Sequence, residues 1–316
     1  MSTVVGLLLR RVGISVLTLL LVSAVVFLIT SLLPGDPAQE MLGQAATPEV
    51  VEALREKLGL NQPAHLRYLN WLLSLLSGDP GVSLANNMPV AELVADRLPR
   101  SLMLAGITTV VAVPFALSVG ITAAMYHGRR ADSIISTAVM FVVAVPEFLV
   151  ATVAVLVFAV ELGWLSAVSY APQNPTLPQF LATYALPVLT LSLVLVGQMA
   201  RMTRAALIEQ LLQPYIEMAV LKGASPARVI LRHALPNAVG PIANAVALSL
   251  SYLMGGVVII EVIFNYPGIA SLMVDSVTNR DFPLLQACAM LFCTGYLILV
   301  LMADTAAILS NPKLRK

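Results

Sequence analysis

Six long apolar blocks separate the polar parts of this chain, and each predicts a membrane-spanning helix. A helix needs about 20 predominantly apolar residues to cross the hydrocarbon core of a bilayer. The first block resembles a secretory signal, but it exceeds the apolar region of about 7–15 residues that such signals carry, and no small-residue cleavage site follows it. We therefore expect six uncleaved spans, at residues 12–33, 101–126, 134–162, 182–199, 239–262 and 284–309.

A polar segment, residues 34–98, separates the first two blocks and predicts a water-facing insertion. It is rich in proline and in acidic residues. Thr47 followed by Pro48 is typical of a helix start, with the threonine as N-cap and the proline in the first turn. We expect this helix to run over 48–58 and to stop at Gly59.

A second short helix is predicted in the same segment, over about 64–76. Its leucines recur at three- and four-residue intervals, so they fall on one face of the helix. Such a stripe more often packs against the rest of a protein than binds a membrane surface, and we expect packing. The leucines are Leu66, Leu69, Leu73 and Leu76.

Composition and charge agree with an integral membrane protein. Of the 316 residues, 59% are hydrophobic and 11% are charged, whereas average chains carry about 25% charged residues. The net charge of +1 argues against broad nucleic-acid binding, which needs a strongly basic face. If the N-terminus is cytoplasmic, most arginines and lysines of the short loops fall on the cytoplasmic side, as the positive-inside rule requires. Both termini are therefore expected in the cytoplasm.

Few ionisable residues fall inside the apolar blocks, and each is by default a candidate for function. Glu147 follows Pro146 near the middle of the third block, where the proline is expected to kink the helix. Glu147 could face a substrate pathway, or it could stay neutral or bond to a neighbouring helix. The fifth block is rich in small and polar residues, which suit either a cavity or close helix packing. Its Asn244 and Ser251 join Glu147 as candidate pathway residues.

The chain lacks the sequence signals of catalysis. It has no GxxxxGK[ST] phosphate-binding loop, so it is not expected to bind ATP by that route. The three histidines are far apart and have no metal-ligand spacing. Cys288 and Cys293 lie five residues apart on one predicted helix, where they point about 140° apart and do not pair. We expect no catalytic residue and no bound metal.

The most specific pattern is the loop between the fourth and fifth blocks, residues 201–238, which predicts a helix–turn–helix. A first helix is expected over about 205–222, with a break near Pro214. It would stop at Gly223, the residue best able to adopt a left-handed cap.

A second helix is expected immediately after this turn. Ser225 would cap it, Pro226 would occupy its first position, and it would end before Pro236. Taken alone, a short helix pair could bind DNA or could simply be a packed loop. A pair tethered on both sides by membrane spans indicates instead a docking surface for a cytoplasmic partner.

This loop resembles the EAA loop of permease subunits of bacterial ABC importers. The motif reads EAA, three residues, Gly, nine residues and then I-x-LP. The matching residues are Glu217, Ala219, Gly223, Leu235 and Pro236, and the departures are Met218 in place of the second motif residue and His233 in place of the isoleucine.

The resemblance extends over nearly the whole chain and narrows to the dipeptide/oligopeptide/nickel branch of these permeases. An ordered series of short motifs carries it. They are LLRR (8–11), LLPGDP (32–37), LGLNQP (58–63), GDPGVS (78–83), RLPRSL (97–102), RMTR (201–204), EVIFNYPGIA (261–270), RDFP (280–283) and NPKLR (311–315).

The resemblance implies an all-α type I importer permease with six transmembrane helices and both termini cytoplasmic. Residues 1–33 would form the N-terminus and first helix, and 34–98 a periplasmic segment. Residues 99–316 would form a five-helix core that includes the coupling loop, as we call residues 201–238. Within this loop the resemblance assigns contact with an ATPase to Glu217, Met218, Ala219, Lys222, Gly223, Ala224, Leu235 and Pro236.

The resemblance also implies partners and a mechanism. A second homologous permease, two ATPase subunits and a periplasmic or lipid-anchored substrate-binding protein would assemble with this chain in the bacterial inner membrane. ATP and magnesium would be bound by the ATPase subunits, and this chain would bind no cofactor. Peptides or a related small solute would be imported as ATP-driven closure of the ATPases moves the docked coupling helix, a rigid-body switch.

Two other functions are compatible with a polytopic membrane protein. A secondary transporter or channel would explain the spans but leaves the ordered cytoplasmic loop without a role. A membrane-embedded enzyme would need a catalytic cluster near the interface, and the glutamates of the spans have no histidine or nucleophile at useful spacing. Transport that continues without ATP would favour the first of these.

Overall fold

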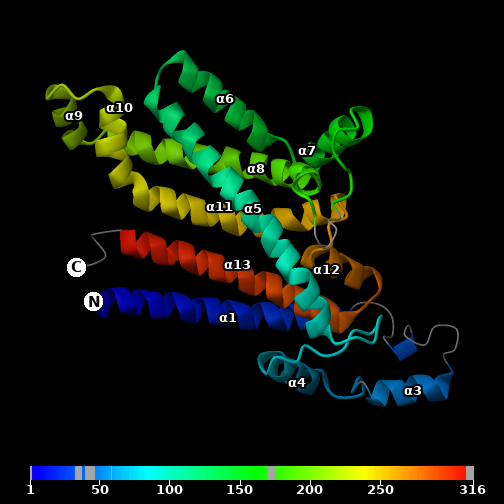
Figure 1. The fold of residues 1–316 in the computed structure, drawn as a ribbon. Coiled ribbons are helices and arrows are strands. Elements are labelled where there is room, and N and C mark those ends of the chain that lie inside the picture. The colour runs from blue at the N-terminus through cyan, green and yellow to red at the C-terminus, as the bar shows by residue number, and fades with distance from the viewer. Residues whose placement is uncertain (1, 33–37, 40–46, 58, 170–174, 311–316) are drawn as a thin grey trace. The chain divides into compact units, whose positions relative to one another are not determined.

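The computed structural model describes residues 2–32, 38–39, 47–57, 59–169 and 175–310, and this part of the chain is almost entirely helical (Figure 1). The elements are α1 (Ser2–Leu32), α3 (Pro48–Lys57), α4 (Ala64–Leu76), α5 (Val90–Met125), α6 (Arg130–Ala144), α7 (Glu147–Ala154), the π-helix η2 (Val155–Glu161), α8 (Leu177–Leu211), α9 (Pro214–Leu221), α10 (Pro226–Arg228), the π-helix η3 (Val229–Ala234), α11 (Leu235–Ile263), α12 (Ile269–Thr278) and α13 (Phe282–Ser310).

All six predicted spans correspond to helices long and apolar enough to cross a membrane. Five are single helices, and the third consists of α6 followed by α7 and η2, with a bend of 93° between the two halves. The bend falls at Pro146, as predicted. Val145 has extended backbone angles, φ −84° and ψ 127°, because the ring of a following proline disfavours the helical conformation.

The two ends of the chain lie on the same side. Arg11 near the start of α1 forms an ion pair with Asp304 near the end of α13, with 3.0 Å between Nη1 and Oδ2. An even number of spans requires this arrangement. Together with the distribution of basic residues in the loops, it places both ends in the cytoplasm.

The chain divides into two compact units, and the first contains Met1–Gly13, Leu102–Tyr266 and Tyr296–Lys316. Its centre is the pair α8 and α11, which pack along each other and against α6 and α7. The buried side chains of this core include Leu186, Leu191, Met199, Ile260 and Phe264. Figure 1 shows α7 near one end of the α8–α11 pair and α9 with α10 at the other.

The second unit contains Ile14–Ser101 and Pro267–Gly295. Its core joins the first turns of α5 to α12 and the first turns of α13 through Val90, Ile269, Leu272, Leu284, Ala287 and Cys288. The helix α12 is short, and the sequence analysis did not indicate it, because a helix of this length carries too weak a periodic signal inside a loop.

The two short helices of the insertion begin where the sequence predicts. α3 starts at Pro48, and Gly59 beyond its end has a φ of +67°. Residue 58, the predicted end of that helix, lies outside the described residues. α4 has the predicted bounds, Ala64–Leu76.

The expected packing of the α4 leucine stripe is wrong. No residue of α4 is buried, and the four leucines are between 44% and 75% exposed. The opposite face of the helix packs instead, because Tyr68 and Trp71 lie against Phe27 of α1. Aromatic rings offer more contact area than leucines at one crossing, so they determine which face turns inward.

Candidate functional site

The first helix of the coupling loop, α9, is seated on the body of the first unit by two side chains. Ile216 and Ala219 are buried, and they pack with Leu207 of α8 and Val229 of η3. α8 ends at Leu211, and α9 begins at Pro214, so the predicted break is confirmed. The predicted start of this helix near residue 205 is wrong, because α8 runs on without interruption from Leu177 to Leu211. The proline suits the first turn because its missing N–H would have no helical partner there.

A Schellman turn at Gly223 ends α9. The N–H of Gly223 donates to the carbonyl oxygen of Val220 over 2.9 Å, and the N–H of Ala224 donates to that of Ala219 over 3.1 Å. Gly223 has a φ of +81°, which confirms the predicted left-handed conformation. No atom lies within 4 Å of the position that a Cβ would take there. Backbone strain alone therefore favours glycine at this position.

The predicted end of the second helix is wrong. α10, η3 and α11 follow one another, so that Pro226–Ile263 is one helical span. In η3 the N–H of Leu235 donates to the carbonyl oxygen of Ile230, five residues earlier. Pro236 cannot donate a hydrogen bond, and the π-helical turn before it already departs from the regular pattern, so the helix continues. Ser225 occupies the N-cap position, although its side chain makes no capping hydrogen bond.

The residues assigned to ATPase contact divide into two groups. Ala219 is buried, and Ala224 and Leu235 are half-buried against the same core, so these residues hold the loop in place. The exposed group comprises Glu217, Met218, Lys222, Gly223 and Pro236.

Further apolar side chains that the motif does not include extend the exposed surface of the loop. Leu212 is 81% exposed and Leu221 is 73% exposed, beside Met218 at 54%. Hydrophobic exposure depends on which face of α9 turns inward, so the sequence alone did not single out the two leucines. We call Leu212, Met218 and Leu221 the apolar loop surface.

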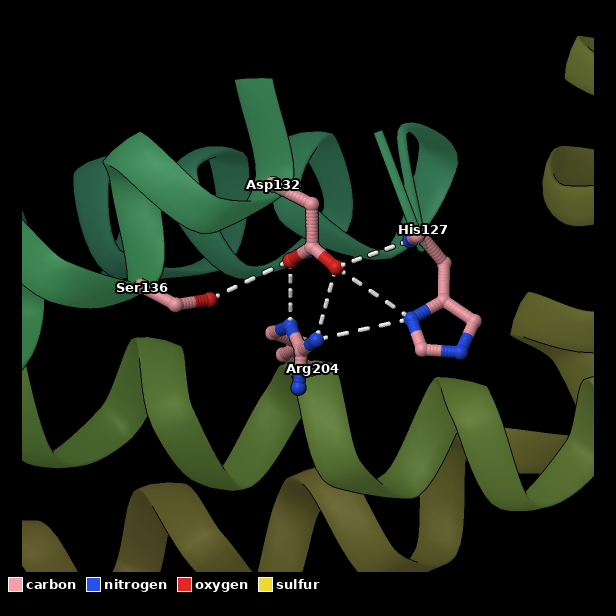
Figure 2. Close-up of polar contacts among 5 residues, drawn as sticks. His127, Asp132, Ser136 and Arg204 are labelled. Atoms are coloured by element: carbon pink, nitrogen blue, oxygen red, sulfur yellow. Dashed lines mark hydrogen bonds and ion pairs between the residues drawn. The ribbon is translucent and has the colours of Figure 1, made fainter. Parts of the chain in front are cut away.

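An ion cluster lies near the same end of the first unit, between the start of α6 and the end of α8 (Figure 2). The carboxylate of Asp132 accepts a bidentate pair of hydrogen bonds from Arg204. Nε donates to Oδ1 and Nη2 to Oδ2, each over 2.7 Å. Asp132 is only 4% exposed, so the pair is shielded from water on the carboxylate side. Paired donors of this kind are among the strongest hydrogen bonds in proteins.

Three further groups complete the cluster. The N–H of Gly128 donates to Oδ2 of Asp132 over 3.1 Å, and the hydroxyl of Ser136 donates to Oδ1 over 3.1 Å. Nδ1 of His127 lies 3.2 Å from Oδ2. Arg204 belongs to the RMTR motif, whereas no sequence pattern indicates a role for Asp132. The cluster fixes α6 to α8 at the beginning of the coupling loop, ahead of α9.

Two of the short sequence motifs, GDPGVS (78–83) and RDFP (280–283), are joined by hydrogen bonds at Asp281 in the second unit. The carboxylate of Asp281, from RDFP, accepts hydrogen bonds from the hydroxyl of Ser83, at the end of GDPGVS, and from the N–H of Leu84 over 3.1 Å. Asp281 and Ser83 are each 1% exposed. The segment after α4 is therefore held against the start of α13.

A second pair of motifs meets nearby in the same unit. The N–H of Ile269, from EVIFNYPGIA, donates to the hydroxyl of Ser101, from RLPRSL, over 2.8 Å. Motifs that lie far apart in the sequence are therefore joined by hydrogen bonds within this unit.

The candidate pathway residues do not form one cluster. Glu147 begins α7 and lies against Gly256 of α11, where a Cβ would come within 2.5 Å of Oε1. Among the described residues, no hydrogen-bond partner reaches Oε1 of Glu147. Ser251 is buried, and its hydroxyl donates to the carbonyl oxygen of Ala247 over 3.0 Å. Asn244 precedes Gly256 by twelve residues on α11, which corresponds to about 18 Å along the helix axis.

The chain is similar over nearly its whole length to transporter permeases. Probable peptide ABC transporter permease protein y4tP of Sinorhizobium fredii is 34% identical over 307 residues, which is 97% of this chain and 98% of that protein. The glutathione transport system permease protein GsiC of Escherichia coli K12 is 36% identical over 298 residues, which is 94% of this chain and 95% of that protein.

The fold also has a solved counterpart. A chain of the MetNI methionine ABC transporter in an inward facing conformation superimposes with a TM-score of 0.58 and 16% identity, over 69% of this chain and 96% of that chain. The expected all-α permease fold is therefore confirmed. A family model described as binding-protein-dependent transport system inner membrane component matches residues 116–316, and its N-terminal companion matches residues 4–105. This chain belongs to the family of binding-protein-dependent transport system inner membrane components.

Proposed function

We propose that this chain is the translocation subunit of an ATP-driven importer of peptides or a related small solute in the bacterial inner membrane. It would pair with a second homologous permease and bind two ATPase subunits through the coupling loop. A periplasmic or lipid-anchored binding protein would deliver the solute to the outer side. The names of the relatives, a peptide permease and a glutathione permease, support this class of solute.

The observation that carries the proposal is the apolar loop surface. Met218 and Leu221 are exposed on α9, whose other face is buried through Ile216 and Ala219, and Leu212 is exposed just before α9 begins. Large apolar side chains exposed to water on a loop that is itself packed on the core support a site of protein contact. Glu217 and Lys222 flank them and supply charges that set the orientation of a partner.

A charge introduced in the apolar loop surface should prevent the ATPase from binding. We expect Leu221→Glu to abolish recovery of ATPase subunits with the tagged chain from mild detergent, because a carboxylate would have to be desolvated in the contact. Leu221→Met keeps the volume and apolar character and should recover them as the wild type does. Recovery is measured by mass spectrometry of the purified complex.

Two outcomes would contradict this prediction. Equal recovery of ATPase from Leu221→Glu would remove the apolar loop surface from the contact. A homomer with no ATPase in the wild type would overturn the importer proposal itself. In that case, solute uptake that persists in cells depleted of ATP would favour a secondary transporter.

We also propose that Glu147 faces the substrate pathway, where it would pair with a cationic group such as a peptide amine. The support is its carboxyl oxygen without a protein partner, at the break of the third span and against a glycine of α11. A broken span inside a transporter often borders a cavity, because unpaired backbone groups need polar surroundings. Asn244 and Ser251 would border the same path at other levels of α11.

Removing the charge of Glu147 should slow transport selectively. We expect Glu147→Gln to lower uptake of a peptide with a free amino end roughly tenfold, the effect of losing one charge-assisted hydrogen bond. Glu161→Gln is the matched control, because Glu161 ends η2 and is exposed, and its uptake should not change. Wild-type uptake by Glu147→Gln at equal membrane levels would remove Glu147 from the pathway.

A further inference from the structure

The α4 helix is attached to α1 by one face only. The ring of Tyr68 lies 5.5 Å from that of Phe27, and the Tyr68 hydroxyl is 2.9 Å from the hydroxyl of Ser23. The ring of Trp71 lies 5.9 Å from the same phenylalanine. These contacts fix which side of α4 faces α1 and leave the leucine face pointing elsewhere.

The contacts of α4 fall on a part of α1 that lies within the membrane. The apolar stretch of this helix is Val5–Leu32, and it contains 18 consecutive residues with a mean hydropathy of 2.8. Ser23 precedes Leu32 by nine residues, which corresponds to about 13 Å of helix. Tyr68 therefore meets α1 well inside the span and not at its end.

The side chain of Arg67, next to Tyr68 in the sequence, extends toward the end of α1 at Ser31. Nη2 of Arg67 donates to the hydroxyl of Ser31 over 3.2 Å, and its guanidinium lies 5.7 Å from the centre of the Phe27 ring. A long cationic side chain that covers an aromatic ring and reaches the end of a span is typical of a residue at a membrane interface.

The leucine face of α4 is apolar along its length, and none of its leucines is buried by the described residues. Leu66 is 44% exposed, Leu69 49%, Leu73 64% and Leu76 75%. α1 beside it is itself apolar and exposed, with Leu21 at 61% and Val25 at 53%. Both residues lie two positions from Ser23 and point away from α4, so α1 carries exposed apolar side chains beside the contact, at the level of the outer half of the span.

We propose that α4 is a membrane-seated helix, with its leucine face inserted among the acyl chains of the outer leaflet. The leucine face contacts lipid, because α4 is attached to α1 at a depth where acyl chains surround the span. Tyr68 and Trp71 lie on the protein side and Arg67 reaches the headgroup level, as in interfacial helices. This proposal is independent of the solute, the ATPase and the binding protein.

Spin labels on α4 distinguish lipid, water and protein as the surroundings of the leucine face. Single cysteines at Leu69 and Leu73, in the full-length chain with Cys288→Ala and Cys293→Ala, are labelled and reconstituted into vesicles of phosphatidylethanolamine and phosphatidylglycerol. Collision of the label with oxygen, which concentrates in lipid, is compared with collision with a water-soluble nickel chelate. Val25→Cys on α1 serves as the lipid control.

A label at Leu69→Cys or Leu73→Cys should collide with oxygen more often than with the nickel chelate, as at Val25→Cys. Glu56→Cys on α3 is the aqueous control and should show the reverse order. Nickel collision that exceeds oxygen collision at both leucine positions would place the face in water and overturn the proposal. Low collision with both reagents would show a protein contact and would overturn it equally.

Discussion

Uptake should be lost in Gly223→Val and largely retained in Gly223→Asn. Both side chains have room, because no atom lies within 4 Å of the position of the Cβ. The difference is in the backbone, since a φ of +81° costs about 1–2 kcal/mol for an ordinary residue, more for a β-branched one and least for asparagine. Strain at this residue opens the Schellman turn and unseats the end of α9. Uptake of a labelled solute at equal membrane levels measures the effect.

A glycine elsewhere separates this effect from general backbone strain. Gly163 has a φ of +62° and also no atom within 4 Å of its Cβ position, but it lies in the loop after η2 and takes no part in the coupling loop. Gly163→Val should therefore keep most of the uptake. If Gly223→Val transports at the wild-type rate, or if both valine variants fail alike, the turn at Gly223 has no special role in coupling.

Arg204→Met should be the most destabilising single substitution in the ion cluster, and a second substitution should reverse most of its effect. Loss of the guanidinium leaves the carboxylate of Asp132 almost fully buried without its cation, and breaking a buried pair in this way costs about 3–5 kcal/mol. Asp132→Leu alone should cost less, because the Arg204 side chain is 28% exposed and can still reach water.

The double variant Asp132→Leu with Arg204→Met removes both charges and should recover most of the stability, since buried ion pairs are often replaceable by apolar groups. Thermal unfolding of the purified chain in detergent measures all three variants. Arg201→Met on the same helix is the control and should be nearly neutral, because Arg201 is exposed and bonds only Gln198 in the described structure. Purely additive effects of the two substitutions would show that Asp132 and Arg204 do not act as a pair.

The helices of this protein could be predicted from the sequence because hydropathy acts over long windows. All six spans, the bend at Pro146 and the bounds of α4 were visible as apolar runs, prolines and leucine spacing. The left-handed turn at Gly223 was also visible, since few residues other than glycine occupy it easily. These features depend on local chain chemistry, which a single sequence reports directly.

The errors and omissions concern contacts between distant segments. The direction of the α4 leucines depends on Tyr68 and Trp71, whose contacts with Phe27 determine which face of α4 packs on α1. The role of Asp132 depends on Arg204, 72 positions later, and no local pattern links the two. The continuation of the helix through Pro236 depends on a π-helical turn, which a proline-based rule does not include. The placement of site residues is therefore decided by tertiary packing.

The hydrogen bonds between Asp281 and the segment at Ser83 have a consequence for the order in which the protein folds during synthesis. Ser83 lies 198 positions before Asp281 in the chain, and the segment around Ser83 emerges from the ribosome long before Asp281 is synthesised. That segment therefore lacks its hydrogen bonds to the Asp281 carboxylate until the start of the last span has been synthesised. The core of the second unit, which joins α5 and α12 to the first turns of α13, can therefore form only after most of the chain has been made.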